Sequence, residues 1–271
     1  SSKSVVCISN QGIGIEMQDQ VAYAKSFGFV MLMCGISGGV FAKVETTPYI
    51  AIHTTPKYAH AKAMPYANVQ APKGGMISSA GNGTFDNLNS MNGKGSAVEG
   101  TNYLFDSLMD NSLDEPSVMY PLLAEKVSFD PAQTKFVIFH LNPKARFSNG
   151  TPLTAHDVKF TFETYLSKSN PGLQMYLSDL DKIEVLSKFD VKMSFKSDNN
   201  AEMPLILAQM PIYSKADWHN KDFTKVTMRP ILGSGPYVID QIDAGRSIRY
   251  KRNPNYWGNS SIPSSCDNAY R

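Results

Sequence analysis

One stretch near the middle of the chain, residues 147–166 (FSNGTPLTAHDVKFTFETYL), constrains the fold more than any other. It begins with turn-forming residues, among which Gly150 can adopt a positive φ at little steric cost. Thr154 follows as a good helix N-cap, and Asp157 three residues later can complete a capping box. Apolar side chains then recur at helical spacing, at Val158, Phe162, Tyr165 and Leu166. The stretch therefore predicts a turn followed by an amphipathic helix that packs onto a core.

Other segments show shorter strand or helix patterns. Apolar and polar side chains alternate in residues 189–196, which predicts a half-buried strand with residues 183–186 as its hairpin partner. Residues 135–141 (KFVIFHL) predict a largely buried strand in which His140 is a hydrogen-bonded sheet residue. We further expect a short strand, two helices and a second hairpin, at residues 76–80, 99–109, 203–210 and 237–250 respectively.

Composition narrows the class of protein. The chain has 271 residues, of which 42% are hydrophobic and 18% charged, as in soluble globular proteins. The formal net charge is only +2 and no basic stripe is present, so no nucleic-acid partner is expected. Metal-site and hydrolase motifs are absent from the sequence, and His53 and His60 are interpreted as isolated surface histidines. We therefore assign no catalytic residue, no metal ligand and no cofactor, although a triad assembled from distant residues would escape this test.

Residues 26–42 (SFGFVMLMCGISGGVFA) have the pattern of a secretory signal. Lys25 precedes the apolar run, and Val40-Phe41-Ala42 offers a cleavage site after Ala42. The run is short and glycine-rich for a transmembrane helix, which needs about 20 apolar residues. We expect a periplasmic protein released after Ala42, with a buried core helix as the alternative interpretation.

The cysteines agree with a periplasmic location. Cys7 and Cys34 would be removed with the signal, so only Cys266 would remain, and a single thiol cannot form an internal disulfide. Met33 is bulky where a lipidation site needs a small residue. We therefore favour a soluble protein over a lipid-anchored one.

Several strings along the chain, taken in order, resemble one protein family. LNPKARF (141–147) leads into the central stretch, and AEKVSFD, GSGPYVI and RNPNYWG stand at residues 124–130, 233–239 and 252–258. Together they resemble the bacterial extracellular solute-binding proteins of the oligopeptide, dipeptide and nickel class, the substrate-capturing subunits of ABC importers. APKGG, GTFDNLNS and SLDEP, at residues 71–75, 83–90 and 112–116, are similar to the branch that imports peptides and microcin C-type peptide–nucleotides.

The resemblance implies an α/β fold of the type II periplasmic-binding-protein kind, a two-lobed clamp with mixed sheets and packed helices. It ends near Gly258, so we expect this chain to be the N-terminal part only, with the second lobe missing. The expected map is an upstream segment plus signal (1–42), an irregular N-terminal arm (43–71), a discontinuous domain I (72–95 and 181–258), an inserted domain II (96–180) and an atypical tail (259–271).

The resemblance also implies a ligand site. In the family the loop after the first strand follows the cleft and offers backbone groups to the peptide, which places Lys94, Gly95 and Ser96 there, together with Asn89 in the same loop. Tyr176 lies near an aromatic ligand contact of the family. Lys94 as an ordinary exposed lysine and Tyr176 as a half-buried packing residue remain equally good interpretations.

The implied function is capture of short peptides, or microcin C-like compounds, in an interdomain cleft and delivery to an inner-membrane permease. Main-chain hydrogen bonds would hold the peptide, as in strand addition, and the protein would act as a monomer without turnover. Three alternatives stay open: a nickel, haem or other small-ligand binder on the same scaffold, a secreted hydrolase without a recognisable motif, and a partial chain that binds nothing.

Overall fold

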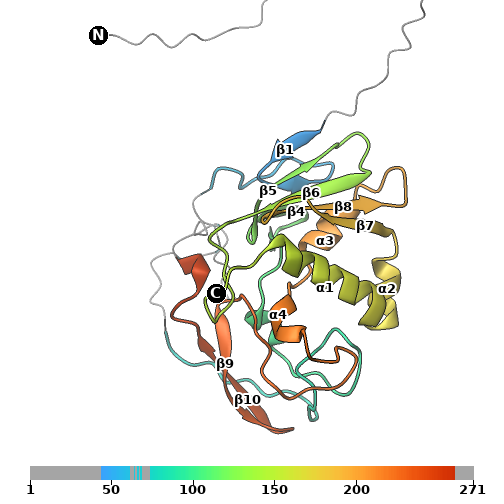
Figure 1. Ribbon diagram of the computed structural model, residues 1–271. Coiled ribbons are helices and arrows are strands. Elements are labelled where there is room, and N and C mark those ends of the chain that lie inside the picture. The colour runs from blue at the N-terminus through green and yellow to red at the C-terminus, as the bar shows by residue number, and fades with distance from the viewer. Residues whose placement is uncertain (1–43, 62–63, 65, 67, 69–73, 260–271) are drawn as a thin grey trace, which may run out of the picture. The chain divides into compact units, whose positions relative to one another are not determined.

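The computed structural model describes residues 44–61, 64, 66, 68 and 74–259. The expected signal segment, its cleavage site after Ala42, all three cysteines and nearly all of the expected tail lie outside these residues. Within them, the chain forms a five-stranded, a three-stranded and a two-stranded sheet (Figure 1). Helices pack against the two larger sheets.

The five-stranded sheet is antiparallel throughout and holds the strongest sequence patterns. Its hydrogen-bonded order is β1 (Glu45–Thr47), β5 (Ala124–Phe129), β6 (Phe136–Leu141), β8 (Asp190–Phe195) and β7 (Leu180–Val185). Val191 and Met193 of β8 are fully buried and face Phe139 and Val137 of β6 across the ladder. The predicted strands at residues 135–141 and 189–196, and the hairpin of β7 with β8, are confirmed.

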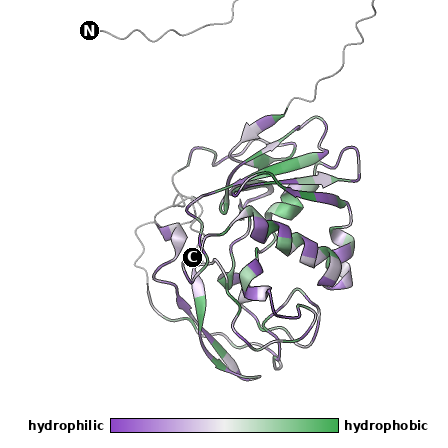
Figure 2. Ribbon diagram, in the orientation of Figure 1, coloured by the Kyte–Doolittle hydropathy of each residue, from purple (hydrophilic) through white to green (hydrophobic). Residues whose placement is uncertain are grey.

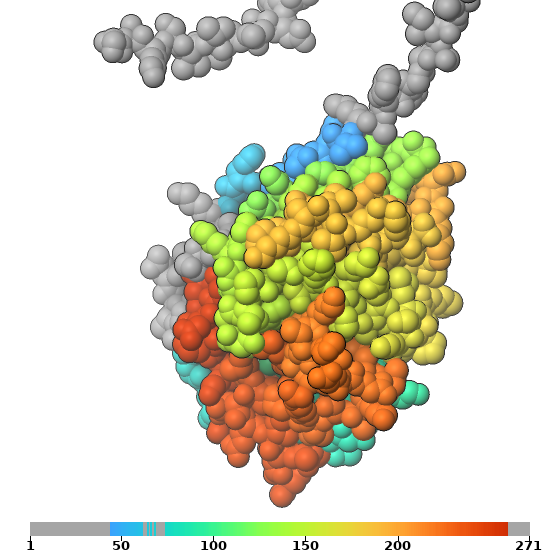
Figure 3. Space-filling view, in the orientation of Figure 1, coloured from blue at the N-terminus to red at the C-terminus, as the bar shows by residue number. Residues whose placement is uncertain are grey.

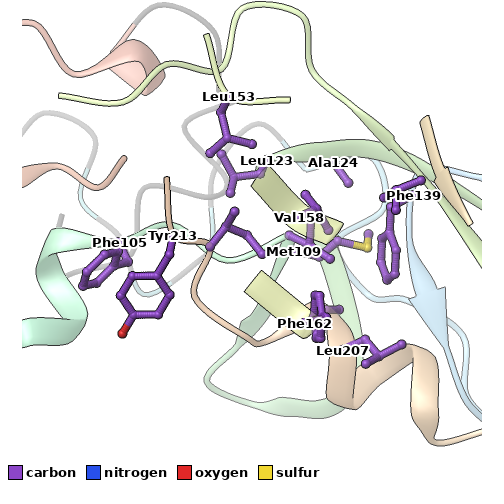
Figure 4. Packing of buried hydrophobic residues seen from close by; sticks show 14 of the residues in the cluster. Phe105, Met109, Leu123, Ala124, Phe139, Leu153, Val158, Phe162, Leu207 and Tyr213 are labelled. Carbon is purple, nitrogen blue, oxygen red and sulfur yellow. The ribbon is translucent and has the colours of Figure 1, made fainter. Parts of the chain in front are cut away.

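The capped helix packs against this sheet as predicted. α1 (Ala155–Lys168) begins after Thr154, whose N–H and hydroxyl both donate to the Asp157 carboxylate at 2.9 Å. Val158 and Phe162 lie among core residues from several strands (Figure 4), and Tyr165 is equally buried. In Figure 2 the visible face of α1 is largely hydrophilic, as an amphipathic helix requires.

A smaller, three-stranded sheet contains one strand of the N-terminal arm. Its order is β2 (Ile50–Ala51), β4 (Glu115–Pro121) and β3 (Met109–Ser112), again antiparallel. The irregular arm predicted for residues 43–71 is therefore wrong in part, because β1 and β2 are both strands and each joins a different sheet. Strands of two or three residues are too short to show an alternation of apolar and polar side chains. They are stabilised by the strands with which they pair.

The remaining elements are short. α2 (Pro171–Tyr176) and α4 (Lys215–Trp218) pack against α1, and α3 (Met203–Ala208) packs against β4. η1 (Thr101–Leu104) and η2 (Trp257–Asn259) are single 3-10 turns. Figure 3 shows the orange segment after α3 lying against the yellow-green surface of α1 and α2. β9 (Tyr237–Asp243) and β10 (Ser247–Arg252) form the predicted second hairpin. The aromatics after it are wedged into the core, since Tyr256 and Trp257 both donate to the buried Asp106 carboxylate.

Two predicted elements are wrong. Residues 76–80 form no strand, and Met76 and Ile77 are 85% and 96% exposed, because no described strand pairs with them. Residues 99–109 form only the η1 turn and then an extended segment. That segment is buried and bonded to its surroundings, with the Leu104 and Leu108 carbonyls accepting from Gly235 and Ala124. Tertiary hydrogen bonds thus replace the local helix that the apolar spacing suggested.

The map of a discontinuous domain I with an inserted domain II stays a prediction. The strand order shows where one of its predicted boundaries falls in the sheet. β5 and β6 belong to the predicted inserted domain, whereas β7 and β8 belong to predicted domain I apart from Leu180. All four are neighbours in one hydrogen-bonded sheet. The expected boundary between residues 180 and 181 therefore falls within this sheet.

Candidate functional site

The loop of residues 81–99 is closed by buried asparagines. The Asn87 carboxamide nitrogen donates to the carbonyls of Asn89 and Lys94 and to Asn92 Oδ1, at 2.8–2.9 Å. Asn87 Oδ1 accepts from the N–H groups of Asn89 and Thr227, both at 3.0 Å. Buried polar groups are costly unless hydrogen-bonded, so this network fixes one conformation of the loop. An asparagine network takes the place of an apolar core here.

The same asparagines attach the loop to a distant segment. Asn89 and Asn92 donate to the Phe223 carbonyl at 3.2 and 3.0 Å, and Asn92 also donates to the Lys225 carbonyl. Asn89 Oδ1 accepts from Met91 N–H at 3.1 Å. Its side chain is fully buried, so the structure gives Asn89 the role of holding the loop. Its predicted contact with a ligand stays untested.

At the tip of the loop, two of the three predicted residues use their main-chain groups internally. Lys94 N–H donates to Asn92 Oδ1 at 3.0 Å, and its carbonyl accepts from Asn87. Ser96 N–H donates to the Asp86 carboxylate at 2.7 Å, and its carbonyl accepts from the backbone of Asp86 and Asn87. Within the described residues, no hydrogen bond uses the Gly95 N–H or carbonyl. Of these three residues, Gly95 is thus the one whose backbone is available to a ligand.

Gly95 is also fixed in its conformation. Its φ is +61°, and a Cβ at this position would lie 2.3 Å from Asp86 Oδ1. Only glycine fits there without strain or movement of the carboxylate. The loop therefore presents an exposed backbone unit in a defined orientation.

Tyr176 lies on α2, which starts against the same loop. Asn170 caps this helix by accepting from Leu173 N–H, and its own N–H donates to the Met91 carbonyl at 2.9 Å. Tyr176 is 55% exposed at the other end of the helix, about 9 Å along the axis from Asn170. Exposure makes Tyr176 accessible, and contact with a ligand remains a prediction.

A hollow beside η1 adjoins the loop and was not predicted. Its volume is about 610 Å³, within the range of small-ligand sites. We call it the η1 hollow. Its walls come from the loop, η1, the segment before β3, β3 itself and the segment after α3, and the lining residues are Ser90, Met91, Thr101, Asn102, Tyr103, Phe105, Ser107, Asp110, Gln209, Met210, Pro211, Tyr213 and Pro236.

The lining of the η1 hollow combines aromatic walls with polar groups. Phe105 and Tyr213 pack with ring centroids 4.7 Å apart, and burial raises the pKa of Tyr213 well above its ordinary value, so its phenol stays protonated. Tyr103 contacts the rings of Tyr237 and Tyr250, which hold it against the hairpin. Among the described residues that line the hollow, Asp110 is the only acidic one and none is Lys or Arg.

Sequence reasoning missed this site because its residues come from four separate segments. The apolar spacing of residues 99–109 places Tyr103 on a helix face, and Asp110 and Gln209 belong to no recognisable motif. No spacing rule joins residue 110 to residue 209. The antiparallel bridge between Ser107 and Pro211 joins two of these segments, and the packing of Phe105 against Tyr213 joins them again.

A second hollow, of about 590 Å³, lies where α1 and α4 begin. Its two carboxylates are already engaged: Asp157 accepts from Thr154 and from Lys215 N–H, and Asp217 pairs with Lys221 at 2.5 Å. These bonds cap helices and fix a loop. We therefore assign the second hollow no ligand.

A serine–histidine–aspartate chain crosses the five-stranded sheet. His140 Nε2 lies 2.8 Å from Ser128 Oγ, and His140 Nδ1 lies 2.6 Å from Asp190 Oδ1. The order matches that of hydrolase triads. Ser128 is only 5% exposed, lies within β5 and also bonds Thr46 of β1 at 2.6 Å, and neither hollow is lined by these residues. The arrangement links β1, β5, β6 and β8, and it confirms His140 as a hydrogen-bonded sheet residue.

The described part of the chain contains neither a metal-binding cluster nor a membrane-spanning helix. No group of three or more His, Cys, Asp or Glu side chains there is placed to hold a metal ion. Among those residues, no helix is both long and apolar enough to span a bilayer.

Known proteins show clear similarity to this chain. A binding protein of Brucella melitensis is 36% identical over 262 residues, which are 90% of this chain and 42% of that protein. In Agrobacterium fabrum, the peptidoglycan-binding protein YepA is 39% identical over 77% of this chain and 35% of its own length. The peptide-binding protein YejA of the same organism is 37% identical over 71% of this chain and 32% of its own. The chain therefore spans about two fifths or less of these relatives.

Solved structures share the fold. A periplasmic oligopeptide-binding protein of Thermotoga maritima, bound to mannohexaose, superimposes with a TM-score of 0.54 and 28% identity, over 65% of this chain and 32% of that one. NikZ of Campylobacter jejuni, in complex with Ni(L-His), gives a TM-score of 0.51 at 19% identity, over 58% and 31% of the two chains. The α/β periplasmic-binding-protein fold, present in part, is confirmed.

The family model that describes the middle region of the family 5 bacterial extracellular solute-binding proteins matches residues 118–265. The match begins in β4 and covers more than half of the 271 residues, including the capped helix α1 and the β9–β10 hairpin. The chain belongs to the family 5 bacterial extracellular solute-binding proteins.

Proposed function

We propose that this chain supplies one wall of the ligand cleft in the substrate-capturing subunit of an ABC importer, and that the ligand is a short peptide or peptide-like compound. Membership of the solute-binding family supports the transport role. The peptide assignment draws on the relatives named peptide-binding and peptidoglycan-binding proteins. The partner is a permease in the inner membrane, the location is the periplasm and the protein acts as a monomer.

The observation that carries this proposal is the η1 hollow beside the loop of residues 81–99. The hollow offers aromatic surface and amide and hydroxyl groups, and the loop offers the unused backbone unit of Gly95. Backbone pairing with side-chain pockets alongside is how extended peptides are held with little dependence on sequence. Ordered water adapts such pockets to different side chains.

The proposed ligands share a peptide backbone. They include simple oligopeptides, peptides derived from peptidoglycan, and microcin C-like peptide–nucleotides. A nickel, haem or other small-ligand binder on the same scaffold is the alternative, since the neighbouring NikZ structure holds Ni(L-His). Rotation of the two lobes about a hinge would bury the ligand and present the closed form to the permease.

Native mass spectrometry of the purified chain is the first test. Gentle denaturation should release heterogeneous short peptides, or the chain should acquire them after incubation with a peptide mixture. An empty protein that stays empty in the mixture would remove peptide binding as an activity of this chain. Co-release of nickel or haem would favour the alternative, and shortened peptides accumulating on incubation would indicate a hydrolase.

A pair of variants locates the site. Asn102→Trp places an indole at the exposed rim of the η1 hollow, whereas Asn255→Trp places one on the exposed loop after β10. Peptide binding by calorimetry should fall at least tenfold in the first variant and stay at the wild-type level in the second. Equal binding by all three proteins would contradict the assignment of the hollow.

A further inference from the structure

One exposed apolar side chain, that of Val226, is held beside the loop of residues 81–99. On one side of it, the Lys225 carbonyl accepts from Asn92 Nδ2 at 2.9 Å. On the other side, Thr227 N–H donates to Asn87 Oδ1 at 3.0 Å, and the Thr227 carbonyl accepts from the backbone of the loop at 2.7 Å. Because both neighbours of Val226 are bonded to the loop, its position there is fixed, although its side chain is 48% exposed.

Val226 lies next to the backbone unit of Gly95. A Cβ added to Gly95 would lie 2.9 Å from Val226 Cγ1, so this methyl group packs close to the Gly95 Cα. The other group on that side is Asp86 Oδ1, which already accepts from Ser96 N–H at 2.7 Å. The glycine whose backbone can pair with a ligand therefore has a partly exposed apolar side chain beside it.

A ligand residue that pairs with Gly95 comes within reach of Val226. Paired residues of neighbouring strands have their Cα atoms about 5 Å apart, and side chains at adjacent positions then touch. Backbone pairing does not by itself distinguish one ligand side chain from another. Contact with Val226 does, because an apolar side chain removes both surfaces from water, whereas a polar one of the same size loses water without gaining a hydrogen bond.

We infer that Val226 is a specificity-determining residue, which selects an aliphatic side chain at the peptide position paired with Gly95. The inference rests on the proposed peptide-binding function and adds the class of side chain that the site prefers. It also gives the segment of residues 223–227 a second role, since the bonds that attach this segment to the loop place Val226 at the ligand.

Seven tripeptides test the preference. Leucine and asparagine side chains have similar shapes, and each is placed in turn at the first, second and third position of an otherwise all-alanine peptide, with Ala-Ala-Ala as the reference. Dissociation constants for the full 271-residue chain are measured by calorimetry. At one position the wild type should bind the leucine peptide about fivefold more tightly than the asparagine peptide. That position is the one paired with Gly95.

Two variants and a matched control test the role of Val226. Val226→Ser removes the methyl groups, so the preference should fall to less than about twofold, while affinity for Ala-Ala-Ala stays within about twofold of the wild type. Val226→Ile keeps a branched apolar surface and should keep the preference. Val44→Ser makes the first substitution at a valine that is 47% exposed and precedes the edge strand β1, and it should leave the wild-type preference unchanged.

The outcomes are distinct. A wild type without a leucine preference at any position, or a preference that survives in Val226→Ser, overturns the inference while leaving peptide binding in place. An equal loss of affinity for all seven peptides in Val226→Ser also overturns it, because Val226 would then only support the loop. Failure of every peptide to bind the wild type overturns the proposed function and this inference with it. Loss of the preference in Val226→Ser alone supports Val226 as the specificity residue.

Discussion

The sheet with α1 and the loop of residues 81–99 are built on opposite principles. The sheet region excludes water with apolar side chains such as Phe139 and Phe162, whereas the loop region buries Asn87, Asn89 and Asn92 and satisfies them with hydrogen bonds. Apolar packing is non-directional and tolerates repacking, but a polar network requires each partner to be in place. The scaffold can therefore vary in sequence while the loop keeps its shape.

The largest effect should come from the scaffold. Phe162→Ala removes a fully buried ring from α1 and leaves a cavity, so the free energy of unfolding should fall by about 3–5 kcal/mol. Chemical denaturation followed by circular dichroism measures this. Glu163→Ala on the exposed side of the same helix is the control, with a change within about 0.5 kcal/mol. A loss below 1 kcal/mol for Phe162→Ala would mean that α1 is not anchored as the structure shows.

A smaller loss of stability, confined to the loop of residues 81–99 and its partner segment, is expected when its asparagine network is broken. Asn87→Ala leaves the carbonyls of Asn89 and Lys94 and the N–H of Thr227 without their partner, and should cost about 2–3 kcal/mol. Hydrogen exchange should show lost protection in residues 86–98 and 223–227, with the sheet unaffected. Uniform loss across the sheet would show that the two regions are not separate in stability.

Gly95→Ala tests the tip of the loop. A Cβ here meets Asp86 Oδ1 and requires a left-handed backbone, so stability should fall by about 1–2 kcal/mol. Gly150→Ala is the matched comparison, because Gly150 has φ +84° with nothing within 4 Å of the added Cβ. The difference between the two variants in thermal melting isolates the contact with Asp86. Equal losses would assign the whole effect to backbone conformation.

The smallest effect on stability is expected from Asp190, the last of the three hydrogen-bonded side chains that cross the five-stranded sheet. The Ser187 hydroxyl, and after it His140, lower the pKa of Asp190 below its ordinary value near 3.8. A lowered folded-state pKa stabilises the protein above the unfolded pKa, and this contribution is lost as pH falls through the folded value. Because Asp190 is 36% exposed, the contribution should be roughly 0.5 kcal/mol.

Asp190→Asn should therefore reduce stability at pH 7 and flatten its decline between about pH 5 and pH 3. Denaturation at a series of pH values measures both changes. Asp243→Asn is the comparison, and it should change the stability less than Asp190→Asn does at pH 7. An unchanged acid limb in Asp190→Asn would show that the linked carboxylate does not stabilise the sheet.

The sheet with α1 could be predicted from local sequence patterns, whereas the hollow beside the loop of residues 81–99 could not. Strict alternation in residues 189–196 and the capped start at Thr154 predicted β8 and α1, because side-chain period and capping are local properties. The same reasoning assigned a helix to residues 99–109, where the apolar spacing is real but the backbone bonds go to distant segments. For the candidate site, resemblance pointed to the loop, and no local pattern pointed to the η1 hollow.

By itself, the sequence determined the helix start, the two hairpins and, through its ordered family strings, membership of the solute-binding family. These depend on neighbours within a few residues or on direct similarity. Only the tertiary structure decided that the N-terminal arm adds a strand to two sheets, that Asn89 is buried, and that Tyr103, Asp110 and Gln209 share one hollow. The reason is physical: hydrogen bonds and burial between residues a hundred positions apart leave no periodic signal along the chain.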